Sequence, residues 1–151
     1  MGLKLLIDIS SEVYIKGSIR PGSVFYFSDE DLSSSEPHYF IVLNINPFTD
    51  STLLLVCSQS SQCEIVKRRR REFPETVVDI SPCEYASFTR NSVVDCNNIF
   101  DRTIAQLAKK RDDNVLKPKP PMPIDIVQKL RTAAINSDLV EQDIKDMLLQ
   151  K

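Results

Sequence analysis

The chain lacks the features by which membrane, secreted and zinc-binding proteins are recognised. No apolar run reaches the roughly 20 residues that a membrane-spanning helix needs. The first apolar stretch is interrupted by Asp8 and is too short for a secretion signal. The four cysteines contain no C-x-x-C pair, which favours reduced thiols over zinc ligands or two disulfides. We therefore expect a cytoplasmic protein with no metal, no other cofactor and no membrane association.

A strong charge of one sign is also missing. The 151 residues carry a formal net charge of -2, so the whole molecule does not attract nucleic acid, and any such affinity must come from a local patch. Hydrophobic residues make up 42% of the chain and charged residues 26%, which predicts a packed core rather than disorder. A chain of this length typically forms one domain.

Three apolar runs of strand length stand close together, and each is bounded by turn-forming residues. They cover residues 23–27, 39–43 and 53–56, and they are rich in branched and aromatic side chains. The turn at residues 44–50 joins the second and third runs as a hairpin. Further strands are expected, from alternation within residues 3–15 and from short apolar segments at 64–67, 76–80 and 92–96.

Helices are expected after the strands. Asp101 is placed to cap a short helix, and the prolines of residues 117–123 favour an extended connector. A helix then runs from Pro123 to about residue 136, and a capping box at Asp138 and Glu141 predicts another. Another capping box, at residues 81–84, predicts a single helical turn.

This order of elements predicts a single α+β domain over residues 1–151, a small β-barrel with short helices and a C-terminal helical segment. Its parts are a barrel core at about 5–100, a helix and proline-rich connector at 101–122, and C-terminal helices at 123–150.

Polar residues gather where two of the strands meet. His38, the only histidine, opens the second strand, and Ser58 and Ser60 follow the third. If these strands pair, their ends converge into one small polar site. A hydrogen-bonded turn histidine and an ordinary polar turn are the alternative interpretations.

The order of motifs resembles the MazF/PemK family of toxin ribonucleases, which share a fold with CcdB toxins. His38 falls where the family has an arginine, and Ser60 falls where it has a threonine near the phosphate. The segments that carry the resemblance are Gly22-Ser23-Val24-Phe25, His38-Tyr39, Phe40 to Asn44, Leu53 to Val56 with Ser58 to Ser61, Val93-Val94-Asp95, and Pro123-Ile124. The resemblance implies an SH3-like barrel, a homodimer, metal-independent cleavage of single-stranded RNA, and an antitoxin whose acidic tail blocks the site.

Metal-free RNA cleavage needs a base for the attacking 2′-hydroxyl, an acid for the leaving oxygen, and donors for the negative charge on phosphorus. Histidine is the side chain type that most readily exchanges a proton at neutral pH, so His38 is the candidate acid or base. Ser60 is the candidate phosphate donor. Arg20 or the run Lys67 to Arg71 would stabilise the charge. The candidates for a second proton-transfer group are Glu36, Asp79 and Asp95.

The sharpest charge feature is a basic run of five successive cations. It consists of Lys67, Arg68, Arg69, Arg70 and Arg71. An exposed loop that aids solubility is one interpretation, and contact with RNA phosphates is the other. Five contacts to a single strand predict that log affinity falls with log salt at a slope near -3.5, from about 0.7 per charge. Few aromatic side chains are nearby for base stacking: Phe73, Tyr85 and Phe88.

Two other functions are compatible with these residues. The first is a non-catalytic barrel of the same fold that binds protein or nucleic acid, as the missing arginine suggests. The second is an unrelated β-barrel module that binds a partner through its C-terminal helices.

Overall fold

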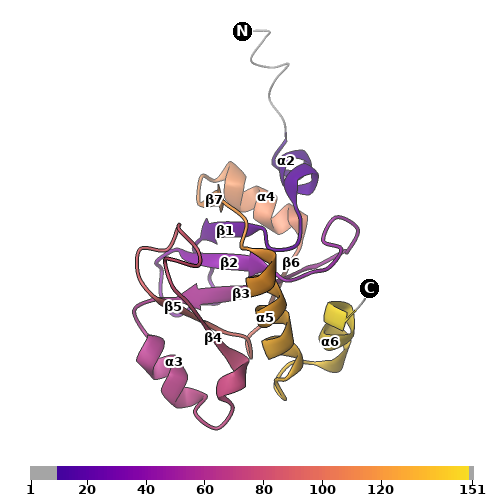
Figure 1. Cartoon of the computed structure of the whole chain (residues 1–151). Helices are drawn as coiled ribbons and strands as arrows, with labels where there is room; N and C mark the ends of the chain where they lie inside the picture. Colours follow the sequence, from indigo (N-terminus) through magenta and orange to yellow (C-terminus); the bar gives the residue numbers. More distant parts are fainter. Residues whose placement is uncertain (1–9, 150–151) are drawn as a thin grey trace, which may run out of the picture.

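The computed structural model of the chain describes residues 10–149. Within that range, seven strands form an antiparallel sheet with the order β4-β5-β3-β2-β1-β7, and β6 also pairs with β3 (Figure 1). The strands are β1 (Val24–Phe27), β2 (His38–Val42), β3 (Leu53–Gln59), β4 (Val77–Ile80), β5 (Ser92–Asp95), β6 (Phe100–Arg102) and β7 (Leu116–Lys119). The helices are α2 (Ser11–Ser18), α3 (Cys63–Arg69), η1 (Pro74–Thr76), α4 (Ile104–Asp112), α5 (Ile124–Ile135) and α6 (Gln142–Leu149).

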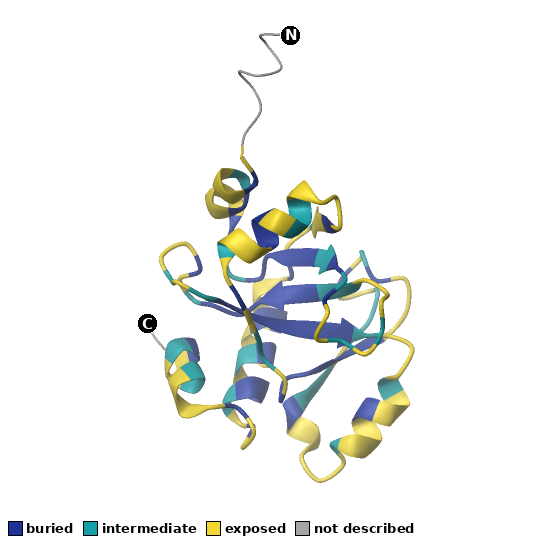
Figure 2. Ribbon diagram, turned by 180° about the vertical axis from the view of Figure 1, so that it is seen from behind, coloured by how far each residue is buried: buried dark blue, intermediate teal, exposed yellow. Residues whose placement is uncertain are grey.

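The three apolar runs form the adjacent strands β1, β2 and β3, as predicted. These three strands are continuously apolar because both faces of the sheet are covered. Alternate side chains of each strand therefore enter two different cores. On one face Phe25 and Phe27 pack with residues of α2 and α4. On the other face Val24 and Ile41 pack with residues of α5. The strands are accordingly buried along most of their length in Figure 2.

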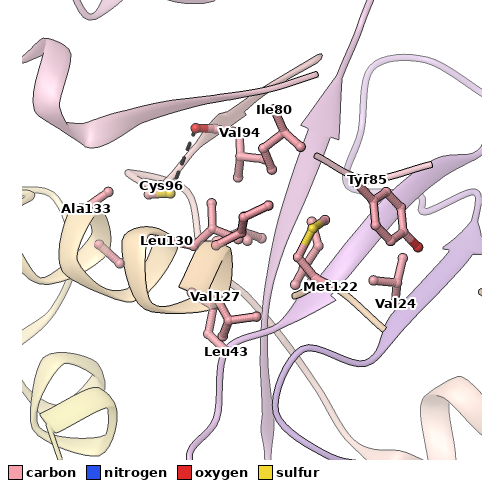
Figure 3. Packing of buried hydrophobic residues seen from close by; sticks show 14 of the residues in the cluster. Val24, Leu43, Ile80, Tyr85, Val94, Cys96, Met122, Val127, Leu130 and Ala133 are labelled. Atoms are coloured by element: carbon pink, nitrogen blue, oxygen red, sulfur yellow. Dashed lines mark hydrogen bonds between the residues drawn. The ribbon is translucent and has the colours of Figure 1, made fainter. Parts of the chain in front are cut away.

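Helix α5 fills the second core with its apolar side. Val127 and Leu130 are fully buried and lie among side chains from β1, β4 and β5 (Figure 3). Gly22 allows this close packing, because its φ of +85° suits glycine and an added Cβ would lie 2.9 Å from the carbonyl oxygen of Met122. The apolar face of α5 is therefore part of the core.

Strand β3 is the centre of the sheet. One edge pairs with β2, while the other edge pairs first with β6 and then, at Ser58 and Gln59, with β5. Among residues 10–149, β4 and β7 end the strand order and do not pair with each other. The α+β class is confirmed, whereas closure of the sheet into a barrel is not shown.

Two expected strands are helical. Residues 64–67 lie in α3, a short helix in which Val66 is the one buried residue. Val13 and Ile15 lie in α2, which begins after Ser10, whose side chain accepts a hydrogen bond from the Val13 amide. The earlier part of that predicted strand, residues 3–9, lies outside the described residues.

Two expected caps are displaced. Thr103 and Gln106 form the capping box of α4, whereas Asp101 lies in β6. Helix α6 begins at Gln142, beyond Asp138. The proline-rich connector is extended, as predicted, and its residues 116–119 pair with β1 as β7. None of the described helices is long and apolar enough to cross a membrane.

Candidate functional site

The register of the sheet brings His38 and the serine turn together. Phe40 of β2 pairs with Cys57 of β3, and the two strands run antiparallel. The start of β2 therefore lies beside the end of β3. His38 is opposite Phe27 of β1, so the histidine is at the end of a three-stranded surface.

Both groups line one hollow of about 650 Å³, which we call the His38 hollow. Of the residues proposed from sequence, His38, Ser58, Ser60 and Glu36 line it. The full lining is Tyr26, Glu36, Pro37, His38, Tyr39, Ser58, Ser60, Ser61, Phe88, Thr89, Arg90 and Ser92. The loops at 60–61 and 88–92 thus meet the start of β2.

The imidazole of His38 has one nitrogen held by the backbone. Nδ1 lies 3.0 Å from the carbonyl oxygen of Glu36. Because a carbonyl oxygen only accepts hydrogen bonds, Nδ1 donates, and Nε2 of the neutral ring is an acceptor. The half-buried ring therefore offers a basic nitrogen for proton transfer.

The hollow contains a cation that the sequence analysis did not select. Arg90 is exposed and lies in the loop before β5. A single arginine in a polar loop forms no motif that would identify it as a site residue from the sequence. Only the pairing of β5 with the end of β3, through Ser58 and Val94, brings this loop to His38.

Aromatic rings form one side of the hollow. The rings of Tyr26 and Tyr39 are 4.6 Å apart between centroids, and Phe88 meets Tyr39 edge to face at 5.1 Å. The Tyr39 hydroxyl donates to the carbonyl oxygen of Ser87 at 3.2 Å. Burial raises the pKa of Tyr39, so this hydroxyl stays protonated at neutral pH. Phe88 was noted in the sequence as a possible stacking partner near the basic run, and it lines the His38 hollow instead.

Several proposed site residues lie elsewhere. Arg20 is exposed and lines a different hollow, beside Lys119 at the β1–β7 edge. Asp79 pairs with Lys67 at 2.8 Å and Asp95 with Arg70 at 3.1 Å, so neither carboxylate lines the His38 hollow. Of the three candidates for a second proton-transfer group, only Glu36 lies there.

The four arginines of the basic run, Arg68 to Arg71, line a second hollow of about 630 Å³, which we call the arginine hollow. It lies at the C-terminal end of α3, whereas Ser60 and Ser61 precede that helix. Lys67 is not part of its lining. The lining is Ile65, Arg68, Arg69, Arg70, Arg71, Glu72, Phe73, Thr76, Asn97, Asp138 and Leu139.

Among residues 10–149 no cluster of three or more histidine, cysteine or acidic side chains is arranged to hold a metal ion. No protein-family model matches the chain, and no curated protein matches it. The case for a function therefore depends on the residues and geometry of the two hollows.

Proposed function

We propose that the protein is a MazF/PemK-like, metal-independent endoribonuclease that cuts single-stranded RNA in the His38 hollow. The observation that carries this proposal is that the imidazole of His38, four serines and Arg90 line one hollow. These are the groups that transfer of the 2′-hydroxyl proton and stabilisation of the phosphorane require.

Each group has a role in the proposed reaction. The 2′-oxygen attacks the adjacent phosphorus, and the bond from phosphorus to the 5′-oxygen breaks, which leaves a 2′,3′-cyclic phosphate. Nε2 of His38 takes the 2′-hydroxyl proton, or in the opposite orientation gives one to the leaving oxygen. Ser60 donates to a phosphate oxygen, and Arg90 neutralises the developing charge. Glu36 is the candidate for the second proton transfer.

The same proposal includes the wider properties of that family. The sheet would correspond to an SH3-like barrel, and the pairing of β3 with three strands supports this. The protein would act in the cytoplasm as a homodimer, and an acidic antitoxin would bind it. Arg68, Arg69 and Arg71 of the basic run would contact RNA phosphates, whereas Arg20 lines a different hollow.

The test is cleavage of single-stranded RNA by the purified protein with EDTA present. The His38→Ala variant is expected to lose at least about 100-fold in rate, since general acid–base catalysis contributes about 10² to 10⁴. The Arg20→Ala variant is the matched control and should cut at the wild-type rate. Intact RNA after prolonged incubation with the wild-type protein, or full activity in His38→Ala, would refute the proposal.

A non-catalytic module that binds single-stranded nucleic acid is the second candidate. It is favoured by the presence of His38 where the family has arginine, and it would form a stable complex without cutting. A module that binds partners through its C-terminal helices is disfavoured, because the apolar face of α5 is buried in the core. Leu148 of α6 is buried in the same core, and Ile144 and Met147 pack against it. Deleting residues 118–151 would therefore expose the core rather than leave a folded barrel.

A further inference from the structure

The basic run is divided by its ion pairs into two kinds of cation. Lys67 and Arg70 are paired with Asp79 and Asp95. Among the described residues, Arg68, Arg69 and Arg71 make no ion pair, and all three are exposed in the arginine hollow. Three guanidinium groups are thus available to an anionic ligand.

A buried network fixes the segment that carries these arginines. Nε of Arg70 donates to Oδ2 of Asp95, and the other oxygen of Asp95 accepts from Nδ2 of Asn97 at 2.7 Å. The amide of Asn97 also donates to Oγ1 of Thr76 at 2.8 Å and accepts from the hydroxyl of Ser137. The C-terminal end of α3 is therefore tied to β5, η1 and the turn before α6, and a ligand would meet a prearranged backbone.

The arginine hollow also has apolar side chains that are unusually exposed. Phe73 is 51% exposed, Leu139 64% and Ile65 47%, and they come from three separate segments. The backbone of Phe73 is fixed, because its carbonyl oxygen accepts hydrogen bonds from both the amide and the hydroxyl of Thr76. The ring is thus presented to solvent from a rigid position.

The mixture of groups distinguishes between ligands. Planar guanidinium groups match phosphate oxygens, and an exposed aromatic ring stacks with a nucleobase. The carboxylates of Glu72 and Asp138 also line the hollow. They would repel an acidic peptide, which offers only more carboxylates, but they can accept hydrogen bonds from the amino groups of bases.

We infer that the arginine hollow is a second binding site for single-stranded nucleic acid, in which the arginines contact phosphates and Phe73 stacks with a base. Helix α3, which separates the two hollows, has seven residues and is about 10 Å long. One strand can therefore occupy both hollows. The inference uses the proposed function only to identify that strand as the RNA substrate, and the arginine hollow contributes binding rather than bond cleavage.

The test is binding of fluorescent single-stranded DNA, which lacks the 2′-hydroxyl and cannot be cut, in oligomers of about 4 and about 12 nucleotides. The Phe73→Ala variant should bind the longer oligomer about tenfold more weakly, because it loses the stacking of one base on the Phe73 ring. Phe48→Ala is the matched control, since Phe48 is 57% exposed and lies outside both hollows. Equal thermal unfolding of both variants checks that they fold.

The outcomes separate this inference from the proposed function. Weakened binding in Phe73→Ala and in Arg69→Gln supports the arginine hollow even if no RNA is cut, a result that would refute the nuclease alone. RNA cleavage with unchanged binding in both variants would overturn the second site and leave the nuclease intact. Displacement of the oligomer by an acidic peptide at equal concentration would also overturn it, in favour of a protein-docking surface.

Discussion

The salt dependence of nucleic-acid binding tests the division of the basic run into paired and unpaired cations. Each phosphate contact to a single strand contributes about 0.7 to the slope of log affinity against log salt, because a condensed counterion is released. Nζ of Lys67 lies 2.8 Å from Oδ1 of Asp79 and Nε of Arg70 lies 3.1 Å from Oδ2 of Asp95. These two cations are already neutralised, so they should add little to the slope.

The expected contribution of the run is therefore about 2.1 from three arginines, rather than about 3.5 from five cations. Between about 50 and 200 mM salt, a contribution of 2.1 corresponds to about an 18-fold loss of affinity and one of 3.5 to about 130-fold. The assay is fluorescence anisotropy of an uncleavable 12-nucleotide single strand across that salt range.

Single substitutions make the test sharper. Arg69→Gln should reduce the slope by about 0.7, whereas Lys67→Gln, which removes the same charge two residues away, should leave it unchanged. The triple variant of Arg68, Arg69 and Arg71 to glutamine should reduce it by about 2.1. An equal reduction in Lys67→Gln and Arg69→Gln would refute the reasoning, because it would mean that the exposed pair with Asp79 opens at no cost when RNA binds.

Three further predictions concern stability and reactivity. Gly22→Ala should lower the free energy of unfolding by about 2–5 kcal/mol, because the added Cβ brings backbone strain and overpacking. Gly17→Ala, on an open face of α2, should instead raise it by about 0.5–1 kcal/mol. Equal urea midpoints for the two variants would contradict this prediction. Asp29, which follows β1, is buried and pairs with Arg102 of β6 at 2.7 Å. Burial alone would raise the pKa of Asp29, but hydrogen bonds from Arg102 and from the Asp31 amide, together with the charge of Arg102, hold that pKa below its ordinary value. The stabilisation from the Asp29 carboxylate is therefore complete above the unfolded pKa of about 3.9 and is lost as pH falls through the lower folded pKa. Asp29→Asn should lower the free energy of unfolding by about 3–5 kcal/mol at pH 7 and by much less near pH 2. A difference between wild type and variant that does not change with pH in urea titrations would contradict this prediction. Burial raises the pKa of Cys57 to about 12, so iodoacetamide at pH 8 should modify exposed Cys83 first and Cys57 only after unfolding, as mass spectrometry can check.

The strands at the centre of the sheet could be predicted because their signals are local. Apolar runs bounded by turn formers identified β1, β2 and β3, and the short turn at residues 44–50 made β2 and β3 antiparallel neighbours. That pairing alone is enough to place His38 near the serines after β3. The error at residues 64–67 arose because four residues with two apolar side chains fit a strand and a helix equally well.

The rest of both hollows depends on contacts between distant parts of the chain. Arg90 reaches the His38 hollow only because β5 pairs with the end of β3. Arg70 is neutralised by Asp95, which is 25 positions away. No periodicity or spacing in a sequence encodes such a partner, because it is chosen by the packing of whole elements.

The sequence by itself determined that the chain forms an α+β fold around three apolar strands, and that one histidine and a serine-rich turn lie at neighbouring strand ends. These features follow from side-chain polarity and from chain connectivity over a few residues. Only the tertiary structure decided which cations remain available to a ligand and that Phe73 joins them in the arginine hollow. The reason is physical: an ion pair or an exposed ring depends on which elements pack against it, and the two cores on the faces of the sheet fix that arrangement.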